Sequence, residues 1–226
     1  MTKSLDDPVS ALAKSVNQAW DTGNAPALRD LIDTASTLYR RIGPPLVRAN
    51  VAFSRANAHS ALRKLDVVQD PQRGWGWDGA ELKHEIYWLR IALADVLEAQ
   101  GDKRKGDLEL RVLTNLANAM SHVGRFCEAI DYWDRAITTE PGFGMALANR
   151  GDGLFWYARA LYDRGHQAVF LWQARKTLAA GLSAGLEPHA VDGVRETITH
   201  LDTLHDWEKF SQELDGYSLG ANEAEQ

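Results

Sequence analysis

Hydrophobic residues recur along this chain at steps of three and four, the spacing that places side chains on one face of an α-helix. Residues 124–141, GRFCEAIDYWDRAITTEP, illustrate the pattern. Ala129 and Ala136 leave hollows for a neighbouring helix, and Trp133 between them is large enough to pack into the next one. Pro141 ends the segment, because proline cannot continue a helix. The segment is therefore predicted to be a helix packed between two others.

The rest of the chain repeats this period, and no stretch alternates with the period of two expected for a half-buried strand. Glycine, proline and short polar breaks divide it into about nine helices with short connections, which favours an all-α protein built from antiparallel pairs. We expect one helical repeat domain over residues 1–214. Its parts are helix pairs at about 9–41, 46–99, 107–140 and 143–184, a loop inserted in the second pair at 65–79, and a capping helix at 188–213, before a flexible tail at 215–226.

Short motifs recur at matching places in these pairs. A small–polar–small triplet occurs in three first helices, as ANA at 56–58 and 117–119 and as GDG at 151–153. The second helices also resemble one another in the strings EIYWLRIAL, AIDYWDRAI and AVFLWQARK. This recurrence indicates a solenoid of stacked repeats, because a simple bundle does not require it.

The recurring pattern resembles the tetratricopeptide repeat, a 34-residue helix–turn–helix with the pattern W-x2-L-G-x2-Y…A-x3-F…P. The match is strong over residues 110–143. Its positions there are Leu113, Leu116, Ala117, Met120, Ala129, Trp133, Ala136 and Pro141. The resemblance implies a right-handed α-solenoid of about four tetratricopeptide-like (TPR-like) pairs, closed by the capping helix.

A longer stretch, residues 114–166, is similar to the TPR region of a bacterial family whose longer members carry a C-terminal HEPN domain, a helical class that includes RNA-cleaving toxins. The GWGW loop at 74–77, followed by ELKHEIYWLRIAL, also fits this family. The resemblance implies that the chain is the repeat module without most or all of the HEPN part. This departure from the longer members argues against an inherited nuclease activity.

In TPR solenoids the first helix of each pair lines a concave groove. Carried over to this chain, the repeat frame places the following residues on the groove: Asn50, Ser54, Asn57, Arg111, Asn115, Asn118, Asn149, Asp152 and Phe155. Asparagine is a poor helix former, so its recurrence at these positions costs stability that packing does not require. An amide both donates and accepts hydrogen bonds, so such a row can hold the backbone of an extended peptide. The alternative is that some of these asparagines cap turns or tie neighbouring helices together.

The inserted loop carries two tryptophans, Trp75 and Trp77, separated by one glycine. Because they lie in a loop, these two tryptophans cannot both pack as residues of a helix face. One interpretation is a lid over apolar surface that the insertion would otherwise expose. The other is an aromatic contact for a partner, because tryptophan is enriched at binding hot spots.

Composition narrows the environment and the class of partner. The net charge of −6 gives no general attraction to nucleic acid or to anionic membranes. Cys127 is the only cysteine, so no internal disulfide can form, which suits a reducing compartment. The N-terminus lacks the apolar core of a signal peptide, and no apolar stretch is long enough to span a membrane. We expect a cytoplasmic protein that binds neither nucleic acid nor membrane.

Candidate chemistry is sparse. None of the seven histidines has the spacing of a metal motif, and the glycine-rich strings lie inside helices where no strand precedes them. No cofactor, metal or catalytic residue is therefore expected. Arg195 and His200 do match the R-x4-H spacing of HEPN nucleases, in which the Arg and His meet across a dimer to cleave RNA.

The sequence thus favours a non-enzymatic scaffold that binds a protein or peptide partner in the concave TPR groove. Two alternatives stay open. One is a HEPN-type RNase or toxin component with Arg195 and His200 as its catalytic pair, and the other is a regulatory module that acts on a HEPN toxin in trans.

Overall fold

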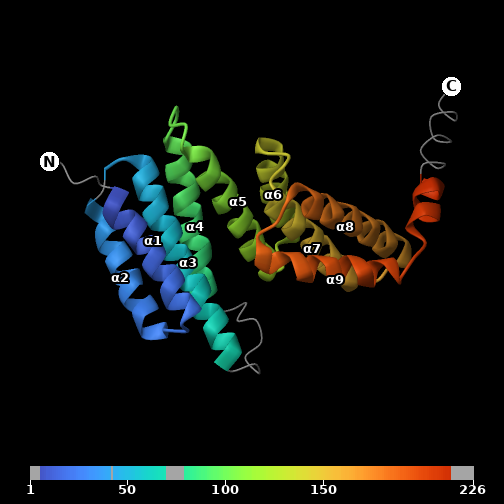
Figure 1. Cartoon of the computed structure of the whole chain (residues 1–226), viewed down its shortest axis with the longest axis horizontal. Coiled ribbons are helices and arrows are strands. Elements are labelled where there is room, and N and C mark those ends of the chain that lie inside the picture. The colour runs from blue at the N-terminus through green and yellow to red at the C-terminus, as the bar shows by residue number, and fades with distance from the viewer. Residues whose placement is uncertain (1–5, 42, 70–78, 215–226) are drawn as a thin grey trace. The chain divides into compact units, whose positions relative to one another are not determined.

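The computed structural model describes residues 6–41, 43–69 and 79–214, and it is helical without strands throughout these ranges (Figure 1). The all-α prediction is confirmed for this part of the chain. Most of the inserted loop, with Trp75 and Trp77, lies outside the described residues, as does the tail at 215–226. Within the described ranges, no helix is both long and apolar enough to cross a membrane.

The chain divides into two compact units, with the boundary between Pro141 and Gly142. The sequence predicts a single repeat domain over residues 1–214. The helices of the first unit are α1 (Asp6–Asp21), α2 (Ala25–Arg41), α3 (Pro45–Gln69), α4 (Ala80–Glu98), α5 (Lys105–His122) and α6 (Phe126–Thr139). Consecutive helices pack on one another, and α3 also packs on α1 and α5. Figure 1 shows α1 to α5 lying side by side. The predicted pairs at 9–41, 46–99 and 107–140 correspond to α1–α2, α3–α4 and α5–α6.

The second unit contains α7 (Gly144–Ala160), α8 (Arg164–Ala184) and α9 (Pro188–Asp202), with α8 packed on both others. The sequence predicts an unbroken capping helix over 188–213. The structure instead ends α9 at Asp202 and resumes as helix only at 207–214. The break lets Trp207 fold back, where its buried indole Nε1 donates a hydrogen bond to the carbonyl of Leu201 at 2.9 Å.

The helix at the repeat match packs as its pattern predicts. Trp133 is 1% exposed, and Ala129 and Ala136 are fully buried on either side of it. The turn before this helix is made by Gly124 with a φ of 76°, a left-handed conformation that glycine adopts without steric cost. The short α5–α6 connection therefore depends on that glycine.

Helices α7 and α8 approach so closely that their contact has no room for larger side chains. A Cβ atom on Gly181 would lie 2.8 Å from the backbone nitrogen of Ala148 and 3.0 Å from the carbonyl oxygen of Gly144. A Cβ on Gly151 would lie 2.7 Å from Leu178. The GDG triplet that marks this repeat in the sequence is thus part of a backbone-to-backbone contact.

Replacing Gly181 with alanine should lower the free energy of unfolding by about 1–3 kcal/mol, because the backbone atoms that the new methyl group meets can move only with their helix. Gly193→Ala is the matched control, since Gly193 lies on α9 with nothing within 4 Å of its added Cβ. That change should stabilise the protein by up to about 1 kcal/mol through helix propensity. Urea unfolding followed by circular dichroism compares the two, and equal effects would contradict the close contact.

Candidate functional site

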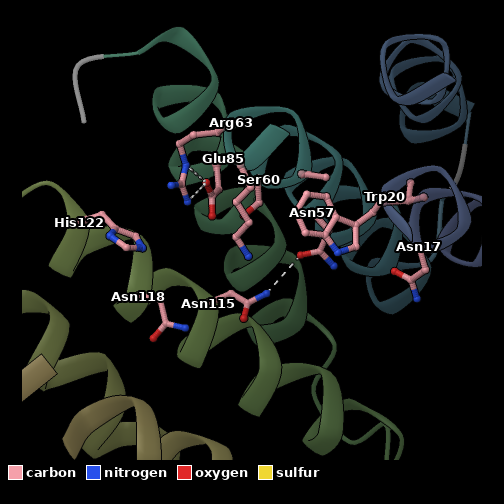
Figure 2. A pocket seen from close by; sticks show the side chains of 12 residues that line it. Asn17, Trp20, Asn57, Ser60, Arg63, Glu85, Asn115, Asn118 and His122 are labelled. Atoms are coloured by element: carbon pink, nitrogen blue, oxygen red, sulfur yellow. Dashed lines mark hydrogen bonds and ion pairs between the residues drawn. The ribbon is translucent and has the colours of Figure 1, made fainter. Parts of the chain in front are cut away.

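Two hollows in the first unit are lined by the same three helices, α1, α3 and α5, joined by Glu85 of α4 in one and by Arg104, the residue before α5, in the other. The asparagine pocket has a volume of about 220 Å³, and its polar and aromatic lining is Asn17, Trp20, Asn57, Ser60, Arg63, Lys64, Glu85, Asn115, Asn118 and His122 (Figure 2). The arginine pocket has a volume of about 340 Å³, and its polar lining is Ser10, Asn50, Ser54, Arg104, Asp107 and Arg111.

The two pockets follow one another along these helices. On α1, α3 and α5 alike, the residues of the arginine pocket precede those of the asparagine pocket in the sequence. The three helices therefore run in the same direction past both hollows, as the first helices of successive pairs would. We call this shared face of α1, α3 and α5 the groove.

All six residues that the sequence assigns to the groove within this unit line one of the two pockets. Asn57, Asn115 and Asn118 lie in the asparagine pocket. Asn50, Ser54 and Arg111 lie in the arginine pocket.

The other three predicted groove residues belong to α7 in the second unit and line none of the hollows described here. Asn149 is half-buried and Asp152 is exposed. Phe155 is buried, and its ring packs edge-on against His200 with 6.1 Å between ring centroids. As placed within this unit, Phe155 contributes to the packing of α7 on α9 rather than presenting its ring to solvent.

The asparagines of the groove also tie helices together. Asn115 Nδ2 donates to Asn57 Oδ1 at 3.2 Å, which links α5 to α3. Trp133 Nε1 donates to Asn118 Oδ1 at 3.1 Å, which links α6 to α5. Asn50 donates within its own helix, to the carbonyl of Leu46. Because an amide carries both donor and acceptor groups, Asn115 and Asn118 can take these structural roles and still line the pocket with their second polar atom.

The lining of the asparagine pocket has a small excess of positive charge, with Arg63 and Lys64 against Glu85. Arg63 and Glu85, both buried, form an ion pair at 3.0 Å, so the one described carboxylate of the lining is already engaged. Lys64, the residue after Arg63, forms no ion pair with a described residue, and its ammonium lies 5.7 Å from the ring of Trp20. Crowding by protein atoms lowers the pKa of Lys64, although its side chain as a whole is exposed.

His122 also lines the asparagine pocket, from the last turn of α5. Crowding of the ring by protein atoms, followed by the charges of Arg63 and Lys64, lowers the pKa of His122 to about 4, even though the residue keeps an exposed face. At neutral pH its imidazole is therefore uncharged.

Arg111 and Arg104 carry the charge of the arginine pocket. Arg111 lies 3.7 Å from Asp107 and places its guanidinium over the ring of Phe53, 5.1 Å from the ring centroid. Arg104 pairs with Asp102 at 2.9 Å. These are surface ion pairs, which are weak enough for a ligand carboxylate to compete with them.

Sequence reasoning missed Lys64, His122 and the Arg63–Glu85 pair. A signal for the first two was present, because helical steps of three and four extend the groove stripe from Asn57 to Lys64 and from Asn118 to His122. No comparable signal marked Arg63 and Glu85, whose pairing depends on how α4 packs on α3.

The residues of the nuclease hypothesis lie on α9. Arg195 and His200 are both exposed, and Arg195 is 3.9 Å from Asp192. Across the described ranges, no three histidine, cysteine or acidic side chains are grouped so that they could hold a metal ion.

Comparison with known proteins identifies no family for this chain. A scan against protein-family models found no match, and searches of curated proteins and of solved structures found none either.

Asn118→Ala should lower the free energy of unfolding by about 1–2 kcal/mol, because it leaves the indole N–H of the buried Trp133 without an acceptor. The same change in a Trp133→Phe background should cost less, since phenylalanine has no N–H to satisfy. Urea unfolding of the four proteins of this double-mutant cycle measures the coupling. An equal cost in both backgrounds would show that the hydrogen bond does not stabilise the α5–α6 pair.

Proposed function

We propose that this protein is a non-enzymatic scaffold that binds an extended, acidic segment of a partner protein along the groove of α1, α3 and α5. The observation that carries the proposal is the joint placement of six groove residues, chosen from the sequence, around two hollows on one face. Amides from Asn57, Asn115 and Asn118 suit a peptide backbone, which offers donors and acceptors whatever its sequence.

The charge of the groove favours an acidic partner. The lining of the two pockets includes four cationic side chains, Arg63, Lys64, Arg104 and Arg111, against the two carboxylates Glu85 and Asp107. This local excess of positive charge stands out in a chain of net charge −6. Complementary charge steers a partner toward the correct surface and suppresses others.

The proposal takes the helix pairs as TPR-like repeats and, with them, the right-handed solenoid of about four pairs that the sequence resemblance implies. The parallel course of α1, α3 and α5 supports this interpretation within the first unit. The proposal also places the protein in the cytoplasm, a reducing compartment in which a scaffold with one free cysteine needs no disulfide.

A random peptide library displayed against the immobilised protein should enrich segments with two or more Asp or Glu residues. Lys64→Glu and Arg111→Glu should each weaken binding of a selected peptide at least about tenfold, because each puts a like charge against the ligand. Arg29→Glu, the same charge change at an exposed position of α2 outside the groove, should alter the affinity less than about twofold. Fluorescence anisotropy gives these affinities. Apolar selected peptides, or equal loss in all three variants, would contradict the acidic groove.

The RNase hypothesis remains the second candidate, because Arg195 and His200 are both exposed on α9 and could meet the same residues of another copy. We expect no cleavage of a mixed RNA substrate by purified protein on a denaturing gel. Cleavage by the wild type that is lost in His200→Ala, and kept in the equally exposed His189→Ala, would replace the scaffold with a nuclease. If the groove captured a HEPN toxin, the scaffold would be the regulatory module acting in trans.

A further inference from the structure

The asparagine pocket has an apolar side as well as a polar one. Figure 2 shows Trp20 of α1 and Asn118 of α5 on different sides of the hollow. The other two apolar lining residues, Val16 and Ala61, are only 3% and 6% exposed. Trp20 is 37% exposed, so it is the lining residue that offers a large apolar surface to a ligand.

The packing of α1 does not account for this exposed indole. The buried residues of α1 in the core of the first unit are Val9, Leu12, Val16 and Ala19, which follow one another at helical steps of three and four. Trp20 lies outside this set. A single exposed tryptophan on a protein surface needs no explanation. This one, however, lies in a hollow beside a lysine, and tryptophan is enriched where partners bind most strongly.

Lys64 restricts where an acid of the ligand lies relative to the indole. Its ammonium is 5.7 Å from the centroid of the Trp20 ring. In an extended segment, side chains two residues apart point to the same face and are separated by about 6.6 Å, whereas adjacent side chains point to opposite faces. A segment that brings one side chain to Trp20 therefore brings the side chain two residues away, and not its direct neighbour, to Lys64.

We propose that Trp20 and Lys64 together recognise an aromatic residue separated by one position from an acid, in either order, within an extended segment of the partner protein. This inference rests on the proposed function and defines the sequence that the groove selects. The ligand ring packs against the Trp20 indole, since aromatic pairs gain more than their buried area alone provides. The ligand carboxylate pairs with the Lys64 ammonium. The amides of Asn115 and Asn118 remain for the ligand backbone.

The test uses the full chain and three serine-based heptapeptides, acetylated and amidated at their ends, each with two glutamates. The spaced peptide has a central phenylalanine and a glutamate two residues away on each side. The adjacent peptide has the same composition, with the glutamates directly beside the phenylalanine. The alanine peptide has alanine in place of the phenylalanine of the spaced peptide. Nuclear magnetic resonance titrations give the dissociation constants and follow the indole N–H signal of Trp20, assigned with a Trp20→Phe variant.

The spaced peptide should bind at least about fivefold more tightly than the other two and should shift the Trp20 signal, because it alone reaches both Trp20 and Lys64. Trp20→Ala should weaken binding of the spaced peptide by about 5- to 30-fold and leave binding of the alanine peptide within about twofold. Unchanged binding of the alanine peptide also shows that this variant keeps its fold. Trp156→Ala removes an exposed tryptophan of α7, outside the groove, and should leave all three affinities unchanged.

The outcomes separate this inference from the proposed function. Equal affinities for the spaced and adjacent peptides, with binding still weakened in Lys64→Glu, would overturn the recognition of an aromatic residue and leave the acidic groove standing. Equal losses for the spaced and alanine peptides in Trp20→Ala would do the same, because the indole would then support the pocket without touching the ligand ring. No binding of any of the three peptides would overturn both proposals.

Discussion

Helix α3 packs on four other helices, which limits the contact of its basic side chains with water and favours their pairing with acids inside the protein. Three of them find an acid on α4. The pairs, with their N–O distances, are Arg48–Asp95 at 2.7 Å, His59–Glu81 at 2.6 Å and Arg63–Glu85 at 3.0 Å. Together they favour the face of α4 that lies on α3, because another register would leave the buried Arg63, Glu85 and Asp95 without partners for their charges. The rest of the first unit is arranged around this α3–α4 pair.

The same pairing accounts for the charge of the groove. The acids of α4 are engaged by the buried side of α3, and Glu85 reaches the asparagine pocket only as the partner of Arg63. Lys64, one residue further along α3, points to the groove side without such an acid. The groove keeps an excess of positive charge because the acids of α4 pair with basic side chains of α3 where these two helices pack. A partner with carboxylates would supply the negative charge that balances the cationic side chains of the groove.

The second unit holds its helices together in a different way. Glycines at 144, 151 and 181 bring the backbones of α7 and α8 together, so shape complementarity takes the place of buried ion pairs. This kind of contact has little tolerance for added volume. It also explains why the first residue of the triplet at 151–153 is glycine, where the first unit has alanine.

The sequence by itself determined the all-helical fold, most of the helix boundaries and the packing role of Trp133, because hydrophobic period and Gly or Pro breaks act locally along the chain. It also placed Asn57, Asn115 and Asn118 on one face. Only the tertiary structure decided what those amides do, since Asn118 meets Trp133 from a different helix. It alone brought Lys64 of α3 and His122 of α5 to one hollow. Charge interactions depend on distances between helices, and no local pattern in the sequence encodes those distances.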